Sequence, residues 1–222
     1  MITMLLSSLF LQAADPAQTT PEQSTAEPAS AETTAADTFD ADAAMAGING
    51  YLNSVDTMRA RFTQVSPHGA LISGLLSMDR PGRLRFEYDD PSPITVIADG
   101  TTVAIEDAAL ETVDRAPIRS TPLYWLLADE IDLAADAEII DIVRELGFIY
   151  VTLRDPNDEM QGTVQFVFEE PTYILREWFV TDALGQMTRV IIQDQEVDVE
   201  LSPRLFVIPE PDDGRDSRRG RR

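Results

Sequence analysis

The stretch RPGRLRFEYDDP, residues 80–91, is the clearest indication of fold in this chain. Pro81-Gly82 predicts a turn, because proline fixes φ near the value that a turn needs and glycine accepts a positive φ. Asp90-Pro91 predicts a second turn where the stretch ends. Between these turns the residues alternate, and Leu84, Phe86 and Tyr88 share one face. We therefore expect a β-strand with one buried apolar face and one charged face in water.

Short alternating segments recur along most of the chain, with turn residues roughly every 8–12 positions. One of these turns, Asp99-Gly100, is typical of a tight hairpin, because both residues tolerate a positive φ. A count of about ten to eleven strands predicts a mainly β fold with a large antiparallel sheet, which has to curve at that size. We expect the strands at residues 59–66, 70–78, 83–88, 94–98, 102–106, 110–114, 139–145, 148–154, 163–168, 173–181 and 187–193, with a last extended piece at 205–208.

Two helices are expected at separate places in the chain. The first starts after Asp40 or Asp42 and runs to about residue 56, and Thr121-Pro122 starts a second, short and apolar one. Both are available to cover the concave side of the curved sheet. The apolar stripe of the first helix is formed by Met45, Ile48, Tyr51, Leu52 and Val55.

The charge and the cysteine content exclude several classes of function. The formal net charge is −22, from 17 basic and 39 acidic residues, and every basic residue is arginine. This balance argues against nucleic acid as a partner, because phosphates require a basic surface. The absence of cysteine excludes disulfides, thiolate nucleophiles and cysteine-based zinc sites.

The two ends of the chain differ in composition from its middle. Residues 1–14 read as a secretory signal peptide, with an apolar segment too short to span a bilayer and small residues at its end, although no Lys or Arg precedes that segment. Residues 15–40 form an acidic leader with too few apolar residues to fold. We expect one folded domain at 41–210 and a disordered, arginine-rich tail at 211–222.

Candidates for catalysis are weak. His68 is the sole histidine and lies in a turn, where an exposed loop residue is the expected role. The sequence holds no G-x-S-x-G, H-E-x-x-H or phosphate-loop motif, and paired carboxylates such as Asp89-Asp90 and Glu169-Glu170 lie at turns of an acidic chain. We therefore expect no enzyme activity, no metal and no cofactor.

The apolar residues of the strands and of the second helix are more informative. They could form an ordinary packed core, or they could line a cavity for an apolar ligand, and alternation alone does not distinguish a filled interior from an open one. The candidate lining residues are Leu84, Phe86, Tyr88, Val103, Ile105, Trp125, Leu126, Leu127, Phe166, Phe168 and Trp178.

The stretch at 80–91 resembles the LolA family of periplasmic outer-membrane lipoprotein carriers, whose members share an Arg-Pro-Gly-basic-aliphatic-Arg-aromatic-Glu-Tyr pattern. Further matches follow in the family's order over roughly residues 40–210: the pair 51–54 and 61–64, the hairpin at 98–100, the helix start at 121–123, the turn at 182–186 and the end at 206–209. Each match alone is weak, and their order and spacing together are fairly specific.

This resemblance implies a half-open antiparallel barrel, with helices across its concave side, that carries the acyl chains of lipoproteins from the inner to the outer membrane. It implies a periplasmic location, an inner-membrane lipoprotein-releasing ABC transporter as donor and an outer-membrane acceptor, and we expect a monomer. Arg80 matches the arginine that, in the family, hydrogen-bonds to the helical lid and holds it closed when the carrier is empty. The acidic leader, the arginine-rich tail and the strong negative charge depart from the family pattern.

Two other functions use the same features. A half-barrel could sense lipid or lipoprotein and regulate an envelope-stress partner, but sensors of this kind usually carry an additional domain, which we do not find in these 222 residues. An acyl-ester hydrolase would need a nucleophile and a base, which we do not find either. The carrier is therefore the preferred interpretation.

Overall fold

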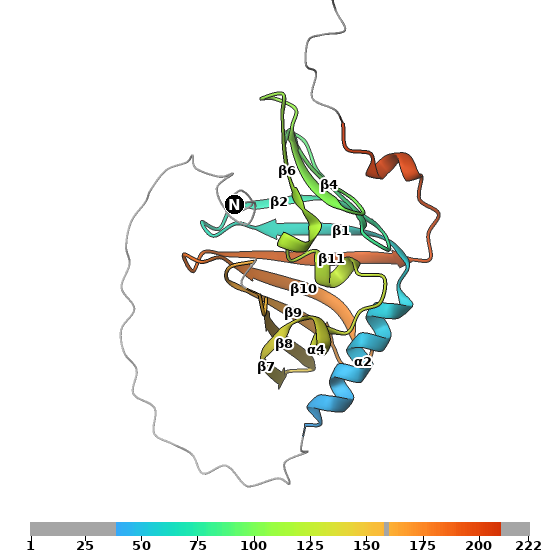
Figure 1. The fold of residues 1–222 in the computed structure, drawn as a ribbon, viewed down its shortest axis with the longest axis vertical. Coiled ribbons are helices and arrows are strands. Elements are labelled where there is room, and N and C mark those ends of the chain that lie inside the picture. Colours follow the sequence, from blue (N-terminus) through green and yellow to red (C-terminus); the bar gives the residue numbers. More distant parts are fainter. Residues whose placement is uncertain (1–38, 158–159, 210–222) are drawn as a thin grey trace, which may run out of the picture.

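The computed structural model describes residues 39–157 and 160–209, which form one antiparallel sheet of eleven strands partly covered by short helices (Figure 1). The strand order is β6-β5-β4-β3-β2-β1-β11-β10-β9-β8-β7, so the first and last strands meet in the middle of the sheet. The sheet stays open, with β6 and β7 at its two edges. The predicted fold, a curved antiparallel half-barrel with a few helices, is confirmed.

The strands follow the alternating segments of the sequence closely. In β1, buried and half-buried residues alternate along the whole strand, which places one face in the core. The strand bounds are β1 Thr57–Val65, β2 Leu71–Asp79, β3 Arg83–Tyr88, β4 Ile94–Asp99, β5 Thr102–Asp107, β6 Thr112–Pro117, β7 Glu138–Glu145, β8 Phe148–Arg154, β9 Thr163–Glu169, β10 Ile174–Thr181 and β11 Met187–Val197.

Helix α2, Ala41–Ser54, begins where the sequence predicts. The carboxylate of Asp40 caps it by accepting a hydrogen bond of 3.0 Å from the backbone N–H of Ala43. Its buried stripe packs on the sheet, and Figure 1 shows the helix running diagonally across one end of it. The stripe consists of Ala44, Met45, Ile48 and Leu52.

A second group of short helices lies over the concave face, between β6 and β7 in the chain (Figure 1). These are the 3₁₀ helix η1, Ile118–Ser120, and the helices α3, Tyr124–Leu127, and α4, Leu133–Asp136. We call α2 together with residues 118–136 the cover. No helix in the described part of the chain is long and apolar enough to cross a membrane.

Three local expectations differ from the structure. The Thr121 hydroxyl donates to the carbonyl of Ile118 and closes η1, so it does not cap the next helix, and α3 starts later, at Tyr124. Residues 205–208 are not a strand, because residues 203–206 form a second 3₁₀ helix, η2, Pro203–Phe206. Helix α4 is absent from the sequence prediction, since four residues are too few for a periodic pattern. The expected signal peptide, nearly all of the acidic leader and the arginine-rich tail lie outside the described residues.

The turn that carries Arg80 is wedged between two other parts of the molecule. Gly82 has a φ of +77°, and a Cβ built on it would lie 2.6 Å from the Cα of Gly100 in the β4–β5 turn. On its other side, the Gly82 N–H donates a hydrogen bond of 2.8 Å to the carbonyl of Leu127, at the end of α3. The turn therefore has a fixed position relative to the cover.

Replacing Gly82 with alanine should lower the free energy of unfolding by about 3 kcal/mol, because the side chain meets both a left-handed backbone and a backbone clash. Gly69→Ala is the matched control: its φ is +81°, but a Cβ there would meet nothing within 4 Å. The control should lose about 1–2 kcal/mol, the conformational cost alone. Urea unfolding measures the free energy of unfolding of both variants. An equal loss in the two would show that the close contact between Gly82 and Gly100 does not constrain residue 82.

Candidate functional site

Two small cavities lie between the concave face of the sheet and the cover. The first, which we call the α2 cavity, has a volume of about 30 Å³, and the second, the rim cavity, has a volume of about 60 Å³. The α2 cavity is lined by Tyr51, Leu52, Val55, Met58, Leu76, Met78, Arg80, Leu84, Leu126, Leu175, Trp178, Ile192 and Gln195. The rim cavity is lined by Gln64, Phe86, Tyr88, Val96, Val103, Ile105, Thr121, Pro122, Leu123, Trp178, Val180, Thr188 and Val190.

Both cavities are almost entirely apolar, and Trp178 lines both of them. Each has room for a few water molecules at most. An acyl chain therefore does not fit into this closed form unless the cover moves away from the sheet.

The structure divides the predicted lining residues into three groups. Phe86, Tyr88, Val103, Ile105 and Trp178 line the rim cavity, and Leu84 and Leu126 line the α2 cavity together with Trp178. Trp125, Leu127, Phe166 and Phe168 line neither cavity and are buried in the core.

Those that line neither cavity pack against other parts of the core. The indole N–H of Trp125 points to α4, with its nitrogen 3.4 Å from the carbonyl of Asp136. The rings of Phe166 and Phe168 lie 6.3 Å apart on β9. Sequence reasoning missed the contribution of α2 to the α2 cavity and the polar residues Gln64 and Thr188 of the rim cavity. The alternation of β1 places Gln64 on the same face as Phe62, which could have identified it.

Three members of an aromatic cluster, Phe86, Tyr88 and Trp178, line the rim cavity. The ring of Phe62 meets Phe86 and Tyr88 edge-to-face, at centroid distances of 4.9 and 5.1 Å, and Phe86 lies 6.3 Å from Trp178. The Tyr88 hydroxyl donates to Oε1 of Gln64 over 2.7 Å. Burial raises the pKa of Tyr88 far above its ordinary value, so this phenol stays protonated and remains a donor.

Arg80 is the one charged side chain that lines either cavity, and it is 9% exposed. Its Nε and Nη2 atoms donate to the carbonyl of Ala128 over 3.1 and 2.8 Å, and Nη2 also donates to the carbonyl of Asp129 over 3.1 Å. Its Nη1 donates to the carbonyls of Leu52 and of Val55, the latter over 3.3 Å. The guanidinium therefore connects both parts of the cover, the end of α2 and the segment after α3, to the turn before β3.

The charge of Arg80 is balanced by carbonyl dipoles. Burial lowers the pKa of Arg80, and the carboxylates of Asp56 and Asp129 oppose this shift through longer-range attraction. Within residues 39–157 and 160–209 Arg80 forms no salt bridge. The carbonyls at the end of α2 also carry the partial negative charge of a helix C-terminus, which favours a cation there.

Two asparagines of α2 add to this connection. The side chain of Asn53 exchanges two hydrogen bonds of 2.8 Å with the backbone of Ile131, and its Oδ1 lies 3.4 Å from Nη2 of Arg80. One turn earlier, Asn49 bonds to the N–H of Leu133 and to the Asp132 carboxylate. Helix α2 and residues 128–133 are thus joined by hydrogen bonds along one edge.

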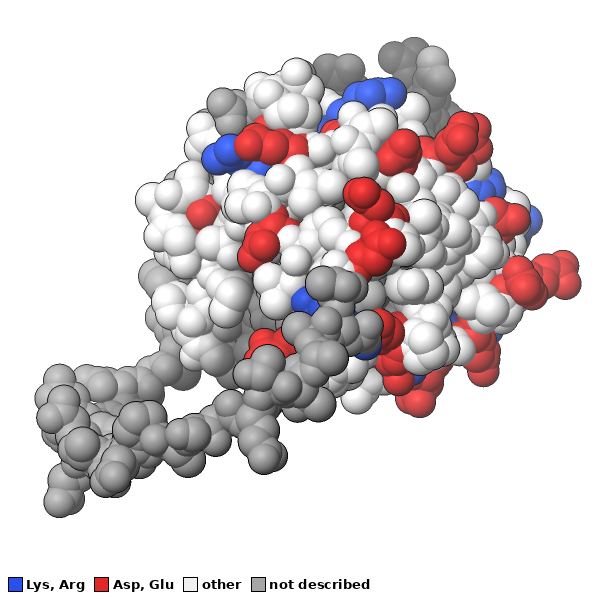
Figure 2. All heavy atoms as spheres, turned by 90° about the horizontal axis from the view of Figure 1, so that it is seen from below, with Lys and Arg blue, Asp and Glu red and all other residues white. Residues whose placement is uncertain are grey.

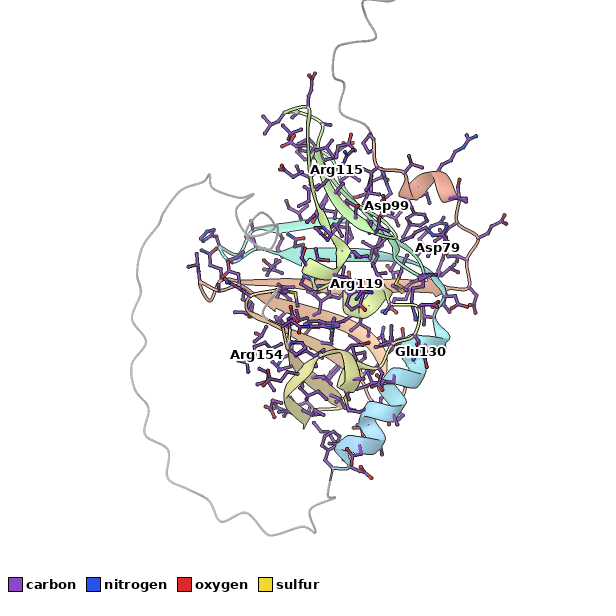
Figure 3. All side chains as sticks on the ribbon, in the orientation of Figure 1. Asp79, Asp99, Arg115, Arg119, Glu130 and Arg154 are labelled. Carbon is purple, nitrogen blue, oxygen red and sulfur yellow. The ribbon has the colours of Figure 1, made fainter. Side chains whose placement is uncertain are left out.

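Most other described arginines lie on the outer surface and pair with carboxylates. Examples are Arg83 with Asp79, at 2.9 Å, and Arg154 with Glu138, at 2.8 Å, and Asp79 and Arg154 are among the residues labelled in Figure 3. Figure 2 shows acidic side chains spread over one face, with basic ones beside some of them. Exposed pairs of this kind contribute about 0–1 kcal/mol each. Arg80 differs from them in burial and in partners.

The described residues offer little for catalysis or metal binding. They contain no group of three or more His, Asp and Glu side chains that could hold a metal ion. His68 is exposed in the turn between β1 and β2. The carboxylates of Asp89, Glu169 and Glu170 pair with Arg61, Arg176 and Arg144, which fits the role of surface charges.

The chain is similar to several known proteins. The sequence model of the family described as outer membrane lipoprotein carrier protein LolA matches residues 53–209. An outer-membrane lipoprotein carrier protein of Nitrosomonas europaea is 27% identical over 180 residues, which cover 77% of this chain and 86% of that protein. One from Legionella pneumophila (strain Corby) is 26% identical over 168 residues, covering 72% and 82%. The crystal structure of a LolA superfamily protein from Nitrosomonas europaea matches with a TM-score of 0.44 at 8% identity, covering 74% of this chain and 97% of the other.

Proposed function

Because this chain belongs to the LolA family of outer membrane lipoprotein carrier proteins, we propose that it encloses lipoprotein acyl chains between its sheet and its cover and carries them from the inner to the outer membrane. The observation that carries the proposal is a pair of small apolar cavities under a cover whose two parts are both held to the sheet by the side chain of one buried arginine. Outward movement of the cover joins and enlarges these cavities.

The energetics favour such a carrier. Burial of each CH₂ group is worth about 0.8 kcal/mol, so an acyl chain binds strongly to any open apolar surface of sufficient size. Release then needs a state of the carrier that binds acyl chains weakly. The closed form described above is such a state, since its cavities hold only a few water molecules.

The location, the partners and the oligomeric state of the protein also belong to the proposal. The signal peptide at 1–14 directs the chain to the periplasm, and the folded domain works there between an inner-membrane ABC transporter and an outer-membrane acceptor. The protein acts as a monomeric carrier and catalyses no reaction. These parts are supported by the family membership and by the composition of the chain.

The test is to express the full chain in a Gram-negative host, purify it from an osmotic-shock fraction and identify the bound molecules by mass spectrometry. We expect a mature N-terminus at Ala14 or Asp15 and co-purifying acylated lipoprotein. A host strain that expresses Phe86→Glu at the same level is the control for lipid that adheres elsewhere. Recovery of unprocessed protein from the cytosol would overturn the carrier role, and recovery with phospholipid but no lipoprotein would favour a lipid sensor.

A further inference from the structure

The rim cavity contains polar groups that a purely apolar container does not need. Thr188 and Gln64 lie on neighbouring strands, β11 and β1, and both contribute to the cavity wall. Gln64 pairs in register with Val190, two residues beyond Thr188 on the same face of β11. The two polar side chains therefore point into the same space.

The hydroxyl of Thr188 has no hydrogen-bond partner among the described residues. Thr188 is 6% exposed, and its Oγ1 is the one buried side-chain oxygen or nitrogen of the described residues without a partner. A buried hydroxyl left in this state is destabilising, and such groups in folded proteins call for an explanation.

Gln64 offers a second donor beside it. Its Oε1 accepts the hydrogen bond from Tyr88, which leaves the Nε2 group on the other side of the amide. Nε2 makes no hydrogen bond to another described residue, and unlike Thr188 Oγ1 it is not fully buried, so it stays accessible at the cavity. Thr121, the remaining hydroxyl of the lining, already donates to the carbonyl of Ile118. The cavity thus presents a hydroxyl and an amide without a protein acceptor, and it is also lined by Trp178, whose indole N–H makes no hydrogen bond to another described residue. A matching ligand supplies an acceptor oxygen.

The position of these donors in the fold is informative. Gln64 and Tyr88 lie at the ends of β1 and β3, and Thr188 lies at the start of β11, so all three lie near the same rim of the sheet. Arg80 precedes β3 and lies at the opposite end of that strand, roughly 20 Å away for about six residues. The apolar walls of the two cavities occupy the distance between the donors and Arg80.

We propose that the rim cavity binds the carbonyl group at the head of an acyl chain, with Thr188 Oγ1 and Gln64 Nε2 as hydrogen-bond donors. The ligand class is an acyl ester or amide, and the inference rests on the proposed carrier function. The hydrocarbon tail then runs along the concave face toward Arg80. The polar part of the cargo leaves at the rim formed by the turns at residues 66–70, 89–93 and 182–186.

The test compares two lipopeptides with equal chain lengths, one with ester-linked and one with ether-linked chains on a glyceryl-cysteine head. Binding is measured by displacement of a fluorescent apolar dye from the full protein. We expect wild type to bind the ester about tenfold more tightly, in line with one to two neutral hydrogen bonds. Thr188→Val should lower the affinity for the ester about threefold to tenfold and leave that for the ether unchanged.

Three further variants complete the experiment. Thr188→Ser keeps the hydroxyl and should restore the preference for the ester, and Gln64→Met should reduce it as Thr188→Val does. Thr63→Val is the matched control, because the Thr63 hydroxyl lies within 3.2 Å of that of Ser73, outside both cavities. A phospholipid with the same ester-linked chains is the last ligand, and tighter binding of the lipopeptide would identify lipoprotein rather than membrane lipid as the source of the carbonyl.

The outcomes separate the two proposals. If wild type binds neither lipopeptide, the carrier function fails. If wild type binds ester and ether equally, or if Thr188→Val weakens both by the same factor, the carrier function stands and the carbonyl site is wrong. If Thr188→Val does not fold, the same comparison with Gln64→Met decides.

Discussion

Replacing Arg80 with leucine should leave the loading of lipoprotein intact and block its release, so that loaded carrier accumulates in the periplasm. The hydrogen bonds from Arg80 to the carbonyls of Leu52, Val55, Ala128 and Asp129 exist only while the cover is closed. In the proposed carrier cycle they stabilise the closed form relative to the open one, to which cargo would bind. Removing them shifts the balance toward the open form by on the order of 3 kcal/mol, about a hundredfold in cargo retention.

The experiment measures lipoprotein bound to the carrier and its transfer to outer-membrane vesicles. Arg80→Lys should be intermediate, because an ammonium keeps the charge but lacks the fork of donors. Arg83→Leu is the control for loss of an arginine nearby, since Arg83 pairs with Asp79 on the outer face. A variant Arg80→Leu that holds less lipoprotein than wild type would reverse the sign of this mechanism, and unchanged transfer would leave Arg80 without a role in release.

Replacing Phe86 with glutamate should abolish binding of acyl chains while the protein still folds. Phe86 is 7% exposed and faces the rim cavity, next to Phe62 and Trp178. A carboxylate among acyl chains costs several kcal/mol, so we expect affinity to fall by more than about a hundredfold. The cavity gives the new side chain some space and access to water in the open form, which limits the cost to folding.

Two further substitutions separate a loss of binding from a loss of folding. Phe168→Glu places the same charge at a fully buried site that lines neither cavity, and this variant should unfold. Phe86→Leu keeps the apolar surface and should keep most of the binding. Circular dichroism and thermal unfolding report folding, and dye displacement reports binding. If Phe86→Glu unfolds as Phe168→Glu does, Phe86 is a core residue and the cavity has no role as a container.

Local sequence patterns predict most of this fold, because strands and turns depend on alternation and on a few Gly, Pro and Asp residues. They fail where an element is too short for a period, as in α4, or where an extended pattern occurs in a 3₁₀ helix, as in η2. The stretch at 205–208 looks like a strand by composition, but its first two residues belong to η2, which Ser202 caps by accepting a hydrogen bond from the N–H of Arg204.

The candidate site is harder to predict from sequence than the fold. Phe86 and Phe166 are both buried aromatic residues in strands with an alternating pattern, yet of these two only Phe86 faces a cavity. The difference depends on which residues pack over each strand. The partners of Arg80 are backbone carbonyls. Every residue has a backbone carbonyl, so the identity of a side chain does not show which residues accept these hydrogen bonds. Sequence identifies the donor here, whereas its acceptors depend on the tertiary arrangement.

The pairing of β1 with β11 has a consequence for how the protein acquires its interior. Strands β2–β6 and β7–β10 are two meanders of neighbouring hairpins, which form from contacts that are local in the chain. The seam between β1 and β11 joins residues as distant as Phe62 and Ile192, and such pairing is slow because a long loop must close first. Gln64 and Met58 lie on one side of that seam, and Thr188 and Ile192 lie on the other, so neither cavity exists until the seam has formed. A nascent chain therefore has no enclosed apolar interior until its eleventh strand is in place.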